Sequence, residues 1–377
     1  MDRRSVLLGG LGTRAALLAA ASCSLVTTVT TVVPPGPAFA APPDPITATA
    51  TLAGTTVSDD GSAITGFEVH DGRNLTLHVH SAAMDTDIAV EVQRPADPSA
   101  PRPVLYLLNG AGGGQDTATW KRNTDATQFF MDKNVNVVMP IGGAFTYYTD
   151  WRSADPKLGQ PMWKTFLTEE LPPLVDAALD TDGTHAIAGM SMSGTSVLQL
   201  AIAAPGLYRA VAAYSGCAQI SDPVGQKFAN LVISIGGGNP VNMYGPLDDP
   251  EWAANDPYVH AEALRGMEIY VSNGSGLPGK HDNVADTRSL GPADGGLPQQ
   301  ILVGGILEAA SDWCARNLKA RLREMSIPAT FDITQAGTHS WGYWQDALRS
   351  SWPVLAKGMG LPDADWAPET QRSSESN

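Results

Sequence analysis

A series of short apolar runs, separated by helical stretches, constrains the fold of this chain more than any other feature. Two early runs, residues 75–81 and 87–95, are rich in β-branched residues and are predicted as strands. Six later runs are apolar along most of their length, as in strands buried on both faces: 103–110, 134–143, 184–191, 210–216, 267–274 and 329–337. This alternation predicts an α/β fold with a mostly parallel central sheet and helices on both faces.

The connecting segments indicate one domain. Residues 162–179 are predicted to be helical, with a Pro pair that bends or interrupts the helix. Residues 274–298 are rich in Gly, Pro and Asp, and we expect a surface excursion because strands and helices resume after it. The predicted domain covers residues 41–360, with an extended lead-in over 41–65, and residues 361–377 form a polar tail expected to be disordered.

Residues 1–40 have the pattern of an export signal. A basic start at Arg3 and Arg4 precedes an apolar stretch, and Ala38-Phe39-Ala40 fits the small-x-small rule for signal cleavage. We expect cleavage near Ala40 and a secreted or cell-envelope protein, while a membrane anchor is the alternative. The arginine pair weakly suggests twin-arginine export, so the route remains open.

Composition excludes several classes of protein. The chain of 377 residues is 43% hydrophobic and 17% charged, which is too apolar and too weakly charged for a disordered protein. With 24 Lys and Arg against 39 Asp and Glu, its formal charge is -15. This excess of acids opposes binding to nucleic acids or to anionic lipid.

The strongest local signal for chemistry lies at Ser191. A buried strand leads into Gly189-Met190-Ser191-Met192-Ser193, and a helix of small residues follows. This is the setting of a nucleophile elbow, in which a tight turn presents a serine at the end of a strand. Ser193 stands where the motif usually has glycine, but it is still small. We therefore predict Ser191 as a nucleophile, and an ordinary strand-to-helix turn is the alternative.

A serine nucleophile needs a general base, and the chain has seven histidines: His70, His78, His80, His185, His260, His281 and His339. His78 and His80 alternate on one strand, but no carboxylate or cysteine cluster accompanies them, so we predict no metal site. His339 follows the last predicted strand, and the base comes last along the chain in this fold. We predict His339 as the base; the alternative is a loop histidine packed on Trp341.

The acid that orients this histidine must lie between Ser191 and His339 along the chain. Spacing alone leaves six candidates open: Asp282, Asp286, Asp294, Glu308, Asp312 and Asp332. Glu308 stands out slightly because it interrupts an apolar stretch at an expected helix start.

An oxyanion hole needs two backbone N–H groups. One belongs to Met192, directly after the predicted nucleophile, and the Gly-rich loop 109–114 supplies the other, with Ala111 as the best-placed donor. A phosphate-binding loop is the competing interpretation of these glycines, but the Lys-Ser/Thr ending is absent. We expect no cofactor.

Removal of the signal leaves two cysteines, Cys217 and Cys314. An oxidising compartment outside the cell would favour one disulfide between them. Two separate buried thiols are the alternative.

Several of these segments resemble the antigen 85 family of secreted mycolyltransferases, which belong to the esterase-D-like α/β-hydrolases. The resemblance spans roughly residues 66–358 and rests on six segments: LYLLNG, VVMPIGG followed by YYTDW, WKTFLTEELP, GMSMSGTS, YGPLDDPEWAANDP and GTHSWGYW. It implies a triad of Ser191, Glu308 and His339, with oxyanion donors at Met192 and Ala111. It also implies that Asn109, Gly110 and Trp341 lie at the sugar-binding part of the site.

The sequence departs from the family in three places. The family motif Asp-Gly-Leu-Arg, whose acid and arginine contact trehalose, is replaced here by Asn109-Gly110-Ala111-Gly112. Asn109 still offers a hydrogen-bonding side chain, but Gly112 cannot replace a guanidinium. Residues 274–300 also diverge, and the family's early cysteine pair is absent.

We therefore expect a secreted serine acyltransferase, a monomer, that moves a mycolyl group between trehalose esters or onto cell-wall sugars through an acyl-enzyme. Its expected partners are a glycolipid or acyl-ester substrate and a sugar acceptor such as trehalose, with association to the cell envelope. A secreted carboxylesterase is the first alternative, because the arginine is lost. A non-catalytic surface protein that binds matrix or glycan is the second.

Overall fold

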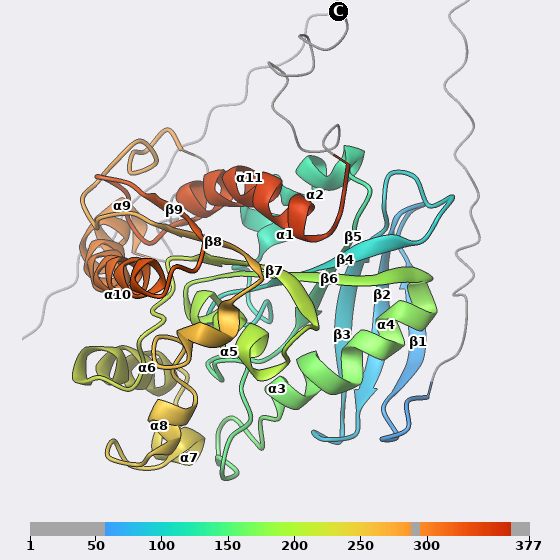
Figure 1. Ribbon diagram of the computed structural model, residues 1–377, viewed down its shortest axis with the longest axis horizontal. Coiled ribbons are helices and arrows are strands. Elements are labelled where there is room, and N and C mark those ends of the chain that lie inside the picture. The colour runs from blue at the N-terminus through green and yellow to red at the C-terminus, as the bar shows by residue number, and fades with distance from the viewer. Residues whose placement is uncertain (1–56, 287, 289–294, 363–377) are drawn as a thin grey trace, which may run out of the picture. The chain divides into compact units, whose positions relative to one another are not determined.

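One mixed sheet organises the described part of the chain. The computed structural model describes residues 57–286, 288 and 295–362. Within them the strand order is β1-β2-β3-β5-β4-β6-β7-β8-β9 (Figure 1). The strands are β1 (Ala63–Val69), β2 (Asn74–Ser81), β3 (Thr86–Gln93), β4 (Arg102–Leu108), β5 (Asn136–Ile141), β6 (Thr181–Met190), β7 (Tyr208–Tyr214), β8 (Glu268–Asn273) and β9 (Thr330–Ile333).

The prediction of a mostly parallel sheet with helices on both faces is confirmed. The pairs β5–β4, β4–β6, β6–β7, β7–β8 and β8–β9 are parallel. The pairs β1–β2, β2–β3 and β3–β5 are antiparallel. In Figure 1, α11, α1 and α2 cover one face of the sheet, and α4 and α5 lie on the other. The helices are α1 (Trp120–Asn123), α2 (Ala126–Phe129), α3 (Trp163–Thr165), α4 (Leu171–Leu179), α5 (Met192–Ala203), α6 (Pro223–Ile235), α7 (Val241–Tyr244), α8 (Glu251–Ala254), α9 (Gly296–Gln299), α10 (Gly305–Glu324) and α11 (Trp341–Gly358).

The apolar strands contribute side chains to two hydrophobic cores, one on each face of the sheet. In β4, Val104, Tyr106 and Leu108 belong to the core under α4 and α5. The alternate residues Leu105 and Leu107 belong to the core under α11. Because successive side chains point to opposite faces, a strand covered on both sides must be apolar throughout. This explains why the sequence of the strand lacks alternation.

The helix predicted over 162–179 contains a widened turn instead of a break. The π-helical segment η2 (Phe166–Glu170) follows α3 and leads directly into α4. Pro172 and Pro173 fall in the first turn of α4, where the missing N–H groups cost least. The pair therefore interrupts the α-helical hydrogen bonds without ending the helix.

The lead-in predicted over 41–65 is wrong at its end, because β1 begins at Ala63. This strand pairs with β2 at the sheet edge, and its side chains are largely exposed, including Phe67 and Val69. An exposed edge strand has no buried face to impose an apolar pattern, so no strand was predicted there.

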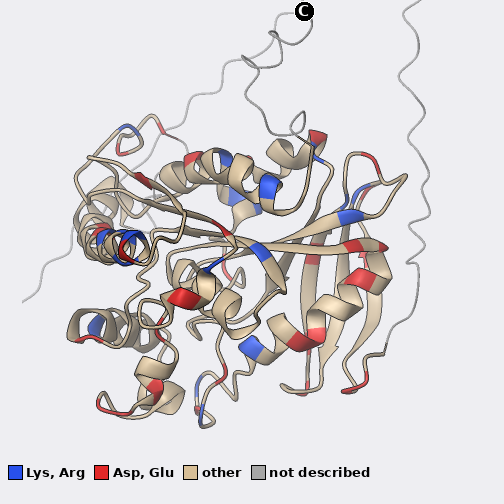
Figure 2. Ribbon diagram, in the orientation of Figure 1, with Lys and Arg blue, Asp and Glu red and all other residues tan. Residues whose placement is uncertain are grey.

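Other predictions fall outside the described residues, namely the export signal over 1–40 and the tail from residue 363 onward. Within the described ranges, no helix combines the length and apolarity needed to cross a bilayer. Figure 2 shows Lys and Arg scattered among Asp and Glu on the helices and loops, while the central strands are mostly uncharged.

Candidate active site

Ser191 lies at the junction between β6 and α5, in a backbone conformation that few residues adopt. Its φ is 58° and its ψ is -124°, and it is the residue directly before the first turn of α5. Its N–H donates to the Tyr214 carbonyl on the neighbouring strand at 2.8 Å. A non-glycine residue held at positive φ marks a strained turn, and such strain concentrates at functional sites.

The neighbours of Ser191 show how the turn closes. Ser193 Oγ accepts from the Met190 N–H at 2.9 Å, and it contacts the Met190 carbonyl at 3.0 Å. A Cβ on Gly189 would lie 2.6 Å from that same Oγ. Glycine is therefore required at position 189 because the side chain of Ser193 occupies the space.

The structure brings Ser191, His339 and Glu308 into one hydrogen-bonded chain. His339 Nε2 lies 2.7 Å from Ser191 Oγ, and His339 Nδ1 lies 2.8 Å from Glu308 Oε2. With a proton on Nδ1, the ring donates to the carboxylate and accepts from the serine hydroxyl. This is the arrangement in which a histidine removes a proton from a serine.

Glu308 is buried in the first turn of α10, and its second oxygen is held by three donors. Oε1 accepts from Ser215 Oγ at 2.8 Å, from the Gly274 N–H at 2.6 Å and from Asn273 Nδ2 at 3.1 Å. Ser215 and Gly274 follow β7 and β8, so the carboxyl ends of two neighbouring strands fix the carboxylate. These residues were not singled out in the sequence; polar residues directly after buried strands were the available signal.

His339 is oriented by contacts on two further sides. Its backbone N–H donates to the Gly304 carbonyl at 3.2 Å, at the end of the π-helical segment η5 (Gln300–Gly304). Its ring meets Trp344 edge to face at 5.0 Å between centroids. Trp344 Nε1 in turn donates to Ser215 Oγ at 3.0 Å, which links this tryptophan to the partner of Glu308.

The Gly-rich loop after β4 lies beside Ser191. A Cβ on Gly110 would lie 3.6 Å from the Cβ of Ser191, so the loop approaches the serine closely. The Ala111 carbonyl accepts from Phe145 N–H at 2.7 Å, which anchors the loop. Met192 begins α5, where the first N–H groups of a helix have no partner within it.

The structure places two of the predicted sugar contacts, Asn109 and Trp341, in largely buried positions. Asn109 is 1% exposed, and its Oδ1 accepts from the Trp120 N–H at 3.1 Å. The oxygen of its carboxamide is thus engaged with the protein backbone. Trp341 is 6% exposed and packs edge to face against Trp120 and Trp344. It is a residue of the core under α11.

The remaining candidates lie outside the hydrogen-bonded chain. His78 and His80 lie on β2, where His78 pairs with Glu68 and His80 pairs with Asp87. His185 pairs with Asp176. In the described ranges no group of three or more His, Cys, Asp or Glu is arranged to hold a metal ion. The remaining acid candidates make other contacts, except Asp294, which lies outside the described residues: Asp282 with Thr338, Asp286 with Arg288, Asp312 with Arg316 and Asp332 with Tyr270.

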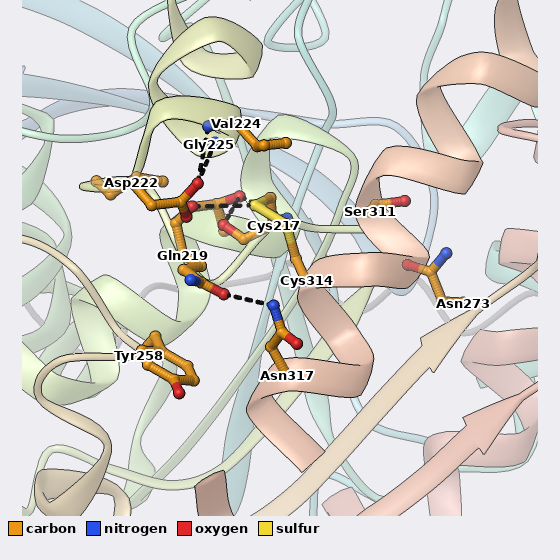
Figure 3. The surroundings of a disulfide bond; sticks show 12 residues. Cys217, Gln219, Asp222, Val224, Gly225, Tyr258, Asn273, Ser311, Cys314 and Asn317 are labelled. Atoms are coloured by element: carbon orange, nitrogen blue, oxygen red, sulfur yellow. Dashed lines mark hydrogen bonds between the residues drawn. A yellow bond between two sulfur atoms is a disulfide. The ribbon is translucent and has the colours of Figure 1, made fainter. Parts of the chain in front are cut away.

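Cys217 and Cys314 form a disulfide close to this site (Figure 3). Cys314 lies on α10, the helix that carries Glu308, and Cys217 lies two residues after Ser215. The backbone of Cys217 is held by Thr195 of α5, whose Oγ1 donates to its carbonyl at 2.9 Å and accepts from its N–H at 3.1 Å. The disulfide therefore joins the helix of Glu308 to a loop fixed on the helix after Ser191.

Comparison with known protein families agrees with this geometry. Residues 81–353 match the model of the family described as "Putative esterase". The chain is 33% identical over 304 residues to the diacylglycerol acyltransferase/mycolyltransferase Ag85A of Mycobacterium tuberculosis, covering 78% of this chain and 84% of that protein. The Ag85B protein of Mycobacterium avium is 32% identical over 294 residues, covering 75% and 83%.

Solved structures show the same fold. The crystal structure of MPT51 from Mycobacterium tuberculosis superposes with a TM-score of 0.63 at 25% identity, covering 76% of this chain and 98% of that one. An S-formylglutathione hydrolase from Agrobacterium tumefaciens superposes with a TM-score of 0.53 at 16% identity, covering 79% and 99%. At that identity the second likeness concerns the fold alone.

Proposed function

The chain belongs to the antigen 85 family of mycolyltransferases within the esterase family, and from this premise we propose that it transfers long-chain acyl groups through a covalent acyl-enzyme on Ser191. The observation that carries the proposal is the hydrogen-bonded chain from Ser191 through His339 to Glu308. Relatives named diacylglycerol acyltransferase/mycolyltransferase indicate acyl transfer as the reaction class.

The proposed reaction has two halves. In the first, Ser191 Oγ attacks the ester carbonyl while its proton passes to His339 Nε2, and the Met192 and Ala111 N–H groups stabilise the oxyanion. His339 then gives the proton to the departing sugar oxygen, which leaves the acyl group on Ser191. In the second, an acceptor hydroxyl gives its proton to His339 and attacks the acyl carbonyl. The bond between the acyl group and Ser191 Oγ then breaks as His339 returns the proton to that oxygen, which restores the enzyme.

Glu308 acts in this scheme through the histidine. Its carboxylate accepts from Nδ1–H, which keeps the lone pair of Nε2 directed at Ser191 and stabilises the imidazolium formed in each half-reaction. The three donors on Oε1 hold the carboxylate in place, so the ring orientation is fixed before substrate binds.

Exposed apolar side chains close to Gly304 in the sequence support a long acyl chain as the group transferred. Leu302 and Ile306 are 66% and 71% exposed, and Val303 is also exposed. They flank Gly304, whose carbonyl accepts from His339. Burying such side chains against an acyl chain is favourable, by about 25 cal/mol for each Å² of apolar surface removed from water.

Trehalose esters as donors, and trehalose or a cell-wall sugar as acceptor, are the finer part of the proposal. So is secretion, which the composition of residues 1–40 supports and with which the Cys217–Cys314 disulfide is compatible. Hydrolysis of acyl esters is a second candidate. Gly112 stands where the family has a sugar-contacting arginine, and Asn109 is buried. The site therefore binds a sugar acceptor more weakly, and water competes better for the acyl-enzyme.

Incubation with trehalose monomycolate, followed by lipid analysis, tests the proposal. Transfer converts two monomycolates into one dimycolate and one trehalose, so we expect dimycolate from the parent protein and none from Ser191→Ala. Free mycolic acid without dimycolate would favour the esterase. No product from the parent, here and with a chromogenic short-chain ester, would favour a non-catalytic glycan-binding protein.

A further inference from the structure

The segment after β8, residues 274–286, is not part of the hydrogen-bonded chain but lies against the loop that carries His339. The Gly276 N–H donates to the Gly337 carbonyl at 2.9 Å, and the Gly337 N–H donates to the Leu277 carbonyl at 2.7 Å. A Cβ on Gly274 would lie 2.5 Å from the Gly337 oxygen. The two loops are thus in backbone contact two residues before His339.

Asp282 extends this contact with a side chain that accepts four hydrogen bonds. Oδ1 accepts from Thr338 Oγ1 at 2.5 Å and from Gln300 Nε2 at 2.8 Å. Oδ2 accepts from Tyr343 Oη at 2.6 Å and from the Gly279 N–H at 2.8 Å. Burial raises the pKa of this carboxyl, but the bonds from Thr338, Tyr343 and Gln300 outweigh burial and keep the pKa below its ordinary value of 3.8.

Three of the four donors, Thr338, Tyr343 and Gln300, belong to segments next to His339. Thr338 is fully buried and directly precedes it in the chain. Tyr343 lies in the first turn of α11, which begins two residues after His339. Gln300 begins η5, the segment that ends at Gly304 and its bond to the His339 N–H. One carboxylate therefore fixes the residue before the histidine, the helix after it and the segment that holds its backbone.

Two residues next to Asp282, Lys280 and His281, bind the segment 274–286 to α11. His281 Nε2 and Lys280 Nζ both lie 2.6 Å from Asp346 Oδ2. A Cβ on Gly342 would lie 2.4 Å from His281 Cγ, so the histidine ring packs directly on the start of this helix. Asp282 is consequently held in place independently of its bonds to Thr338 and Tyr343.

We propose that Asp282 is a positioning residue that keeps the His339 imidazole between Ser191 and Glu308 by anchoring Thr338. This inference rests on the proposed function, because it assigns a role in catalysis by His339. A carboxylate suits the task, since all four partners donate hydrogen bonds. An amide of the same shape turns its NH₂ group toward one or more of these donors.

The test compares kcat and KM on a chromogenic short-chain ester for the parent, Asp282→Ala, Thr338→Val and the double variant. Displacement of a catalytic group by about 1 Å costs on the order of 100-fold in rate, so we expect Asp282→Ala to lower kcat by roughly 10- to 100-fold. We expect KM to stay within about threefold, since the bonds of Asp282 orient the base and not the ester.

The double variant separates positioning from general damage. If Asp282 acts through Thr338, the double variant loses no more than the worse single variant, because the two losses share one cause. Losses in kcat that multiply, or a parent-like kcat in Asp282→Ala, would overturn the proposal. Should Asp282→Ala fail to unfold cooperatively on heating, Asp282→Asn decides in the same assay: a lowered kcat supports the proposal and a parent-like kcat contradicts it.

Two further proteins complete the design. Asp71→Ala is the matched control, because Asp71 also organises a turn by accepting from the Arg73 and Asn74 N–H groups, but it does so between β1 and β2 at the far edge of the sheet. We expect parent kcat from it. Ser191→Ala separates the proposed function from the role of Asp282. If this variant turns over the ester like the parent, the proposed function fails, whatever the result for Asp282→Ala.

Discussion

At the scale of single residues, the elbow shows how a departure from a motif is accommodated. Ser193 replaces the usual glycine, and its hydroxyl bonds back to the Met190 backbone inside the turn. The space for it comes from Gly189, which has no side chain to collide with that hydroxyl. The two positions therefore depend on each other, and a side chain at 189 would disturb the turn that presents Ser191.

Glu308→Gln is predicted to lower kcat by about 10³- to 10⁴-fold. Three donors on Oε1 keep the amide oxygen on their side, so the new NH₂ group faces His339 Nδ1. A donor there turns Nδ1 into an acceptor and moves the ring proton to Nε2, where it blocks proton removal from Ser191. Steady-state turnover of a chromogenic ester measures the effect.

The control for this variant is Glu324→Gln, an exposed glutamate at the end of the same helix. It removes one negative charge from α10 without contacting the site, and we expect it to keep parent activity. A Glu308→Gln protein with parent kcat would show that the glutamate does not set the tautomer of His339.

At the scale of elements, Cys217–Cys314 ties α10 to the loop after β7, across a sequence separation of 97 residues. Around it, Asn317 Nδ2 of α10 donates to Gln219 Oε1 at 2.9 Å (Figure 3). Gly216, beside Cys217, allows this loop to touch α5, since a Cβ there would lie 2.3 Å from Gly194 C. The helix of Glu308 is thus fixed to α5, the helix that follows Ser191.

Reduction of this disulfide is predicted to lower the free energy of unfolding by about 2–5 kcal/mol. The reason is that the unfolded chain gains conformational entropy when the large loop closed by the disulfide is opened. Thermal unfolding with and without a thiol reductant measures the change as a lower Tm. The Cys217→Ser/Cys314→Ser variant serves as the control, since it should melt at the lower temperature and ignore the reductant. A parent protein whose Tm is the same under both conditions would contradict the prediction.

Elements were predictable from sequence where burial forced a pattern. Strands β4, β6 and β7 are covered on both faces, and their apolar runs matched them, whereas the exposed edge strand β1 left no such pattern. The positions of Ser191 and His339 followed from a local motif and from chain order. The partners of Glu308 were not predictable, because Ser215 and Asn273 meet it only through the pairing of β7 with β8.

At the scale of the described domain, the parallel strands bring the functional residues together. The strands β6, β7 and β8 are neighbours in the sheet, and they are directly followed by Ser191, Ser215 and Gly274. These three residues therefore lie together at the carboxyl ends of the strands. Polar groups that follow parallel strands converge at these carboxyl ends, and open α/β sheets bind their ligands there. Helix α10 and the loop before α11 then place Glu308 and His339 against these strand ends.

The most direct test of the account is the mass of the protein during turnover. If Ser191 carries the acyl group, rapid quenching with acid after mixing with a trehalose ester yields protein heavier by one acyl group, on the peptide that contains Ser191. The Ser191→Ala protein should show no such increase. Turnover by the parent without an acylated Ser191 peptide, or an equal mass increase in Ser191→Ala, would contradict the proposed mechanism.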